Sequence, residues 1–124
     1  MWCRLVSDLR CPLCAGPLQC HSFAEERIPI SANHLSLARR QSIYSADFDR
    51  YVNEGVLLCH SCRVQFAITR GVPVLLPYSL PLHGQFTKQF QPSISALPVH
   101  YDFPNVKPIS GERNVLDSFS SEWL

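Results

Sequence analysis

Residues 56–77 read VLLCHSCRVQFAITRGVPVLLP, and this stretch decides the fold. Its cysteines, Cys59 and Cys62, are separated by two residues, as are Cys11 and Cys14 near the amino terminus. A two-residue spacer lets both thiols of one tight turn face the same ion, so two such pairs supply four ligands. The spacing predicts a structural zinc site with one Zn²⁺ per chain. Four protein ligands leave no open position on the metal, so the site is expected to stabilise the fold and not to catalyse.

The residues that follow the second cysteine pair predict a β-sheet. Apolar side chains alternate with polar or small ones along residues 64–69, which is the period of a half-buried strand. Residues 70–71 indicate a tight turn, and residues 72–76 a returning strand. Pro73 cannot donate to a ladder, so this strand is expected at an edge. With residues 56–58, these elements predict a three-stranded antiparallel sheet whose one end is held by zinc.

The long segment between the cysteine pairs, about residues 20–55, is expected to be a helical insert. Ser31 is a candidate N-cap for a first helix that ends near residue 41. A second helix is predicted near residues 48–52, where apolar side chains fall at i, i+3 and i+4, and Gly55 stands where a helix often ends. The fold class is therefore small α+β, a zinc ribbon with a helical insert.

The last third of the chain changes character and is expected to be an extended, proline-rich arm. Five prolines are spaced through residues 78–111, which also hold few charges. The apolar side chains of the final residues fall on one helical arc, so the arm is expected to end in an amphipathic helix. The predicted division is a zinc-ribbon domain at residues 1–80 and an arm at residues 81–124.

Composition excludes several classes of protein. The net charge of +1 gives no electrostatic case for binding a polyanion. No apolar run is long enough for a signal peptide or a membrane span, so we expect a cytoplasmic protein without membrane contact. The chain has no glycine-rich strand-to-helix turn that could hold a nucleoside cofactor, and it is too short for a doubly wound domain as well. We therefore expect no enzymatic activity from this chain on its own.

The two cysteine pairs, together with the run Gly71-Val72-Pro73-Val74-Leu75-Leu76-Pro77, resemble a known family. This is the small zinc-ribbon family that activates tRNA and release-factor methyltransferases, including copies fused ahead of S-adenosylmethionine-dependent methyltransferase domains. The similarity covers about residues 8–79. It implies a non-catalytic module that binds a methyltransferase, either as a separate chain or as its N-terminal region, and meets nucleic acid only indirectly.

Two apolar regions are candidates for contact with such a partner. An apolar returning strand at a sheet edge is a natural surface for another protein to cover. The final helix carries a Phe-x-x-x-Trp pair similar to one that follows the ribbon in fused members of the family. The candidate partner-binding residues are Phe66, Val72, Pro73, Val74, Leu75, Phe119 and Trp123.

Two other functions remain open from the residues alone. A zinc ribbon can recognise nucleic acid when basic or aromatic side chains cluster on its sheet. Rubredoxin-type electron carriers also use two Cys-x-x-Cys turns, with iron in place of zinc. The glycines that usually follow the second cysteine of each turn in those carriers are absent, since Ala15 and Arg63 stand there.

Overall fold

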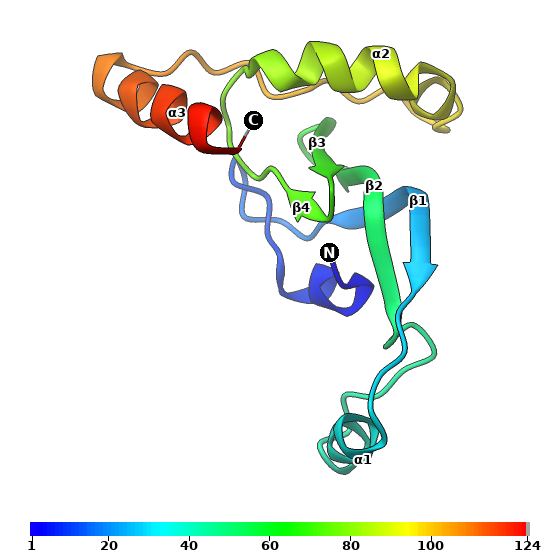
Figure 1. Cartoon of the computed structure of the whole chain (residues 1–124). Helices are drawn as coiled ribbons and strands as arrows, with labels where there is room; N and C mark the ends of the chain where they lie inside the picture. Colours follow the sequence, from blue (N-terminus) through cyan, green and yellow to red (C-terminus); the bar gives the residue numbers. More distant parts are fainter. Residues whose placement is uncertain (124) are drawn as a thin grey trace.

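An antiparallel sheet with the strand order β1-β2-β3-β4 forms the centre of this computed structural model, which describes the backbone of residues 1–123 and the side chains of residues 1–118. Helix α2 covers one face of the sheet, a short 3₁₀ helix (η1) lies on the other side, and α1 lies at the far end of the β1–β2 hairpin (Figure 1). The elements are η1 (Cys3–Asp8), β1 (Gln19–Arg27), α1 (Ala32–Arg40), β2 (Arg50–Cys59), β3 (Val64–Thr69), β4 (Val72–Pro73), α2 (Pro81–Ser95) and α3 (Ser110–Trp123).

The small α+β class and the cysteine-bearing antiparallel sheet are confirmed. The expected number of three strands is wrong, because the described residues form four. The missed strand is β1, whose residues Gln19 to Arg27 pair along nearly the whole length of β2. Its sequence is mostly polar because it lies at the edge of the sheet, where none of its residues is fully buried.

The expected insert is partly helical. Helix α1 forms where it was predicted, and the Ser31 side chain accepts a hydrogen bond from the backbone N–H of His34. The second predicted helix is wrong, since Arg50 to Cys59 form β2. The apolar spacing near residue 50 arises because a turn carries Phe48 into the core just before the strand begins. Gly55 packs against β1, where a Cβ would lie 2.6 Å from the carbonyl oxygen of His21.

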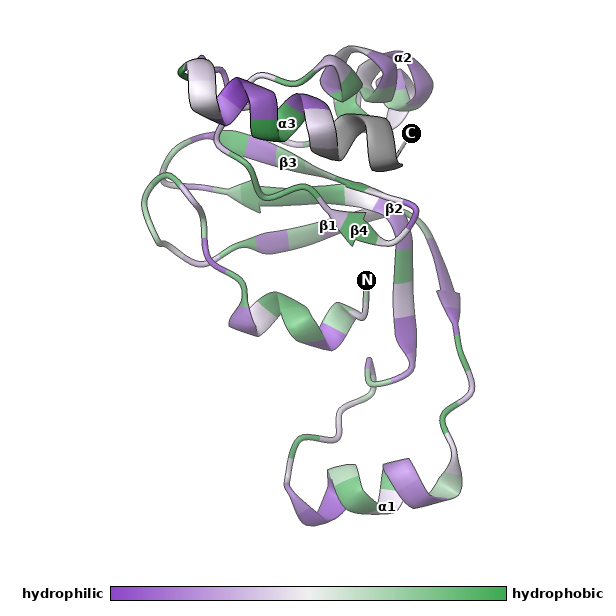
Figure 2. Cartoon of the chain, turned by 60° about the vertical axis from the view of Figure 1, so that its left-hand side comes forward, coloured by the Kyte–Doolittle hydropathy of each residue, from purple (hydrophilic) through white to green (hydrophobic). Residues whose placement is uncertain are grey.

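Two hydrophobic clusters hold the sheet, one on each face. The cluster that contains Cys11 and Cys59 also includes Val52, Leu57, Phe66 and Ile68. The opposite cluster joins Val56, Leu58 and Ala67 of the sheet to Phe86 of α2 and to Tyr101. Figure 2 shows hydrophobic residues along β3 and along part of β2, interrupted by hydrophilic ones. The strict alternation along β3 therefore buries one set of side chains on each side.

Helix α2 replaces part of the arm that was expected to be extended. Pro81 stands at the first turn, where a missing N–H costs nothing. The helix tolerates Pro92 by bending, because Phe90 has non-helical angles of φ −113° and ψ 21°. Residues 96–99 form a turn and a bend, residues 100–109 follow with isolated bridges only, and the final helix forms as predicted in α3. The division of the chain near residue 80 remains a prediction.

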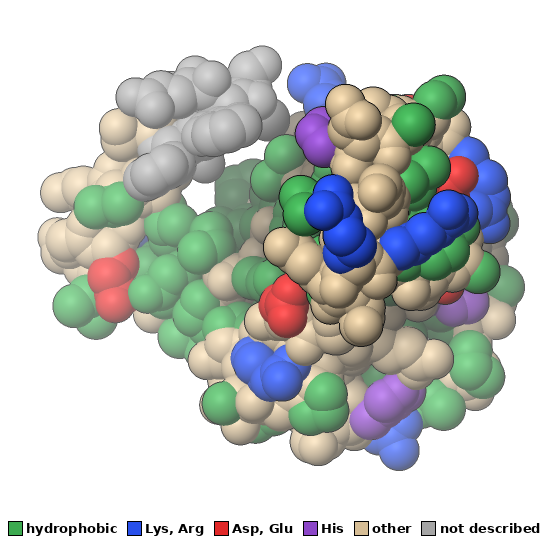
Figure 3. All heavy atoms as spheres, turned by 90° about the horizontal axis from the view of Figure 1, so that it is seen from below, with side chains coloured by type: hydrophobic (Ala, Val, Ile, Leu, Met, Phe, Trp, Pro, Cys, Tyr) green, Lys and Arg blue, Asp and Glu red, His purple; other side chains and the backbone are tan. Residues whose placement is uncertain are grey.

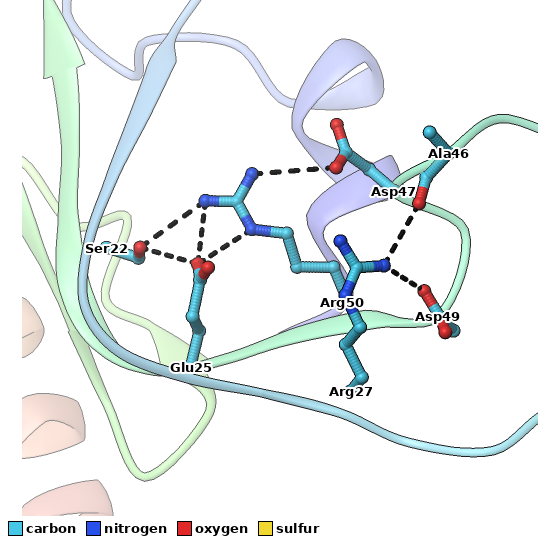
Figure 4. Close-up of polar contacts among 7 residues, drawn as sticks. All are labelled: Ser22, Glu25, Arg27, Ala46, Asp47, Asp49 and Arg50. Carbon is cyan, nitrogen blue, oxygen red and sulfur yellow. Dashed lines mark hydrogen bonds and ion pairs between the residues drawn. The ribbon is translucent and has the colours of Figure 1, made fainter.

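Ion pairs hold the far half of the β1–β2 hairpin (Figure 4). The Arg50 guanidinium donates to Glu25, with 2.7 Å between Nε and Oε2, and also lies 3.8 Å from Asp47. The Arg27 guanidinium donates to Asp49 at 2.6 Å. The neighbouring arginine lowers the pKa of the Glu25 carboxyl from its usual range, and a hydrogen bond from Ser22 adds to this effect.

Candidate metal centre and partner surface

The four predicted ligands, Cys11, Cys14, Cys59 and Cys62, come together at one end of the sheet. Their sulfur atoms all lie within 4.8 Å of one another, and 3.5 Å separates the Sγ atoms of Cys14 and Cys59. A zinc ion with Zn–S bonds of about 2.3 Å requires sulfur atoms about 3.8 Å apart at the corners of a tetrahedron. The cluster therefore fits a tetrahedral ion, and its four cysteines could hold a metal.

Each cysteine pair sits in a tight turn whose backbone N–H groups point at sulfur. Such hydrogen bonds stabilise a thiolate relative to a thiol, which is the form that binds metal. The N···S distances are 3.4 Å from Leu13 to Cys11, 3.4 Å from Gly16 to Cys14, and 3.5 Å from Cys62 to Cys59.

The two turns share an unusual backbone angle at the residue after the second cysteine. Ala15 has φ +61° and Arg63 has φ +56°, both in the left-handed region that glycine favours. The chain thus adopts the turn geometry of a metal knuckle even without glycine. The missing glycines noted in the sequence do not prevent these two turns.

The four thiols differ in environment. Cys11 and Cys59 are buried, Cys62 is half-buried and Cys14 is exposed. The N–H of Gly16 lowers the pKa of the Cys14 thiol, whereas the hydrogen bond to Cys14 raises the pKa of Cys62 to about 12. Burial raises the pKa of Cys11. Because a metal binds thiolates, its binding must release these protons, and its affinity is expected to rise with pH.

Comparison with known families gives one clear match. A family model described as Trm112p-like protein matches residues 4–71, more than half of the 124-residue chain. The chain belongs to the Trm112p-like protein family. This family activates methyltransferases and is not itself catalytic, so the predicted family and the predicted non-catalytic function are confirmed. No match was found among curated proteins or among solved structures.

The matched region of this Trm112p-like chain includes all four cysteines and ends at Gly71. Helix α2, the extended segment after it and α3 lie beyond the match. Among the helices of residues 1–123, none has the length and hydropathy needed to cross a membrane.

The predicted partner-binding residues fall into three groups. Phe66 is fully buried in the first cluster and presents no surface. Val72 is 44% exposed, and Pro73, Val74 and Leu75 beside it are half-buried. The side chains of Phe119 and Trp123 lie outside the described residues. Among the predicted residues whose side chains are described, a partner can therefore reach only those of the β4 segment, which we define as Val72, Pro73, Val74 and Leu75.

Further apolar side chains are exposed in the C-terminal half of the chain. These residues are Leu76, Val99, Val106, Ile109 and Val115, with exposed fractions from 36% to 70%. Hydrophobic side chains gather on the left of the space-filling view, around one acidic side chain, and most of the basic side chains lie on the right (Figure 3). Contiguous exposed apolar surface is characteristic of protein interfaces.

Sequence reasoning missed the residues that surround the metal end. Gln19, His60 and Tyr101 form a hydrogen-bonded chain beside the second cysteine turn. The first two are separated by 41 residues, as are the last two, and no spacing pattern in the sequence relates them. One indication in the sequence that residues of the C-terminal arm pack on the sheet is that aromatic residues such as Tyr101 are frequent there.

Proposed function

We propose that this chain binds and stabilises an S-adenosylmethionine-dependent methyltransferase, either as a separate subunit or as the N-terminal region of the same polypeptide. The family match over residues 4–71 is the observation that carries this proposal. The proposed contact surface consists of Val72, Pro73, Val74 and Leu75, with Phe66 supporting it from the core and with Phe119 and Trp123 contributing from α3.

The mechanism is the burial of apolar surface. A catalytic subunit that exposes a hydrophobic patch is stabilised when the β4 segment covers it. A protein that binds only the folded form of its partner shifts the folding equilibrium of that partner by mass action, by about 2.7 kcal/mol at a hundredfold excess over the dissociation constant. The partner then spends more time in the state that binds its cofactor.

We infer that the metal is zinc, with one ion per chain. Four sulfur ligands in two tight turns suit Zn²⁺, which has no geometric preference of its own and forms closed tetrahedral sites in structural roles. Metal analysis of the purified protein tests this inference. About one equivalent of zinc supports it, whereas a red, iron-containing protein would indicate an electron carrier.

We also infer that the chain acts in a reducing compartment, as expected for the cytoplasm. Four of the six cysteines are the proposed zinc ligands, which bind the metal as thiolates. Cysteines of this kind keep their metal where thiol reductants prevent disulfide formation.

The partner proposal is tested by co-expression of the tagged chain with candidate methyltransferases. We expect a complex that co-purifies and raises the melting temperature of the methyltransferase. Val72→Asp should weaken the complex at least tenfold, because it places a charge in an apolar contact.

The matched control is Ile43→Asp. Ile43 is 57% exposed beyond the end of α1, at the opposite end of the molecule from the metal. This variant should bind like the wild type. Equal weakening by both variants, or no complex with any methyltransferase, would contradict the proposal.

A further inference from the structure

The extended segment after α2 pairs with the sheet beside the second cysteine turn. The backbone N–H of Gln65 donates to the carbonyl of Asp102 at 2.9 Å, and the N–H of Asp102 donates to the carbonyl of Arg63 at 3.0 Å. These bonds form a parallel bridge between Val64 and Asp102. The segment therefore pairs with the start of β3, the part of this strand that β4 leaves unpaired, close to the proposed ligand Cys62.

Tyr101 connects this segment to the turn that holds two of the ligands. Its side chain is 3% exposed, and 2.6 Å separates its hydroxyl oxygen from Nδ1 of His60, which lies between Cys59 and Cys62. The Gln65 side chain donates to the carbonyl of Tyr101 at 2.9 Å and fixes the backbone there.

The direction of each hydrogen bond follows from the available donors and acceptors. His60 Nε2 lies 2.5 Å from the amide oxygen of Gln19, which can only accept. In neutral His60 the proton is therefore on Nε2, and Nδ1 accepts the hydroxyl proton of Tyr101. Both ring nitrogens of His60 are hydrogen-bonded, and these two bonds orient the imidazole and the turn that carries it.

We propose that Tyr101 is a positioning residue for the metal site and that it acts through His60. Outer hydrogen bonds of this kind orient metal ligands in other proteins. By thermodynamic linkage, a contact that holds the ligand turn in its metal-binding form must also be strengthened by the metal. The metal and the C-terminal segment thus stabilise each other, although Tyr101 lies outside the matched family region.

This proposal rests on metal binding by the four cysteines and is independent of any methyltransferase. Zinc content is therefore measured first, on the full-length wild type. If the wild type binds no metal, the zinc inference fails. If it binds metal normally, the following comparison tests the role of Tyr101 alone.

The measurement is the rate at which the loaded chain transfers zinc to the colorimetric chelator 4-(2-pyridylazo)resorcinol. Tyr101→Phe keeps the buried ring and removes only the hydroxyl. We expect it to release zinc about three- to tenfold faster, the range that corresponds to loss of one neutral hydrogen bond. Tyr78→Phe is the matched control, because Tyr78 bonds to Glu112 of α3 and does not touch His60. It should release zinc at the wild-type rate.

A double-mutant cycle separates positioning from simple packing. If Tyr101 acts through His60, then Tyr101→Phe has no further effect on zinc release in a His60→Phe background. Hydrogen exchange provides a second readout. In Tyr101→Phe the amides of Gln65 and Asp102 should exchange faster, whereas the amide of Val52, which donates to Met1, should not change. Equal release by wild type and Tyr101→Phe, or additive effects in the cycle, would overturn the proposal.

Discussion

Gly71 occupies a position that no other residue can fill without strain. It has φ +76° in the turn between β3 and β4, and a Cβ there would collide with the ring and hydroxyl of Tyr51 and would lie 2.9 Å from the amino nitrogen of Met1. The preceding Arg70 also has a positive φ of +51°. The turn predicted at residues 70–71 is therefore confirmed, and its geometry explains why glycine stands at the second position.

Gly71→Ala is expected to lower the free energy of unfolding by about 1–3 kcal/mol, because the left-handed angle and the collision both act against alanine. Urea denaturation of the zinc-loaded protein measures this change. Gly84→Ala is the control, because a Cβ at Gly84 meets nothing within 4 Å and alanine favours helix α2. It should be neutral or stabilising by up to about 1 kcal/mol. A similar decrease in the free energy of unfolding in both variants would show that the angle and the contacts at Gly71 are not its cause.

His83 makes the docking of α2 sensitive to acid. Its ring is 7% exposed, stacks on Phe103 with 4.6 Å between ring centroids, and has no hydrogen-bond partner for Nε2 among the described residues. Burial lowers the pKa of His83 to about 4, below the ordinary value of 6.5. Between these values the unfolded chain binds a proton that the folded chain does not, so stability falls as the pH decreases from about 6.5 toward 4.

His83→Gln should remove this contribution, because glutamine stays neutral. We expect the stability difference between wild type and variant to change by about 1–3 kcal/mol between pH 7 and pH 4.5, in favour of the variant at low pH. Thermal unfolding at both pH values measures it. The metal site loses affinity in acid in both proteins, so only the difference between them is informative. Parallel pH curves would exclude His83 as the cause.

At the scale of elements, the β1–β2 hairpin shows a charge network at its end distant from the metal. Glu25→Gln removes the main partner of Arg50 and should destabilise by no more than about 1 kcal/mol, because both side chains are partly exposed. The lowered pKa of Glu25 means that this contribution is present above the ordinary pKa of 4.5 and is lost as the pH falls through the lower folded value.

The salt dependence of stability distinguishes a contribution of this charge network from a contribution of side-chain packing. Raising NaCl from 0.05 to 1 M should reduce the difference between wild type and Glu25→Gln, since salt screens partly exposed charges. Glu26→Gln is the matched control on the same strand, because Glu26 forms no ion pair among residues 1–118. An equal, salt-independent loss in both variants would indicate that strand propensity is responsible. Urea denaturation at the two salt concentrations measures each difference.

Elements with a local signal could be predicted from the sequence. The cysteine pairs, the alternation along β3, the Ser31 cap of α1 and the turn at Gly71 each depend on residues close together in the chain. Strand β1 had no such signal, because its exposed edge position removes the apolar alternation that identifies a strand.

The errors elsewhere had two different physical causes. The apolar spacing around Phe48 to Val52 imitated a helix, although Phe48 belongs to a turn and Val52 to a strand. Helix α2 forms where the sequence predicts an extended arm, because proline usually breaks helices. Pro81 is tolerated at the first turn and Pro92 at a bend, and its buried face is provided by the sheet, which local sequence does not reveal.

For the whole molecule, the end of the sheet that carries the four clustered cysteines is expected to control stability. The first hydrophobic cluster contains the proposed ligands Cys11 and Cys59, so loss of a bound metal would leave two buried thiols without their bonds. Cys59→Ser should abolish zinc binding and unfold the sheet at 37 °C, because structural zinc contributes on the order of 10 kcal/mol. Circular dichroism and metal analysis measure both effects.

Cys20→Ser provides the control for that prediction. Cys20 is a half-buried cysteine of β1 that lies outside the four-sulfur cluster. Its replacement should keep one zinc per chain and a folded sheet. A metal-free chain that remains folded, or zinc loss in Cys20→Ser as well, would contradict the assignment of the four ligands.

The position of Trp2 makes its intrinsic fluorescence a probe of the sheet. Its indole meets Tyr51 of β2 edge-on with 5.3 Å between ring centroids, and the Arg4 guanidinium lies 4.4 Å from its ring. The sequence contains two tryptophans, so Trp123→Phe leaves Trp2 as the single indole fluorophore. Its emission then reports the environment at the amino-terminal side of the sheet. Metal loss could be followed by fluorescence in real time without attaching a label.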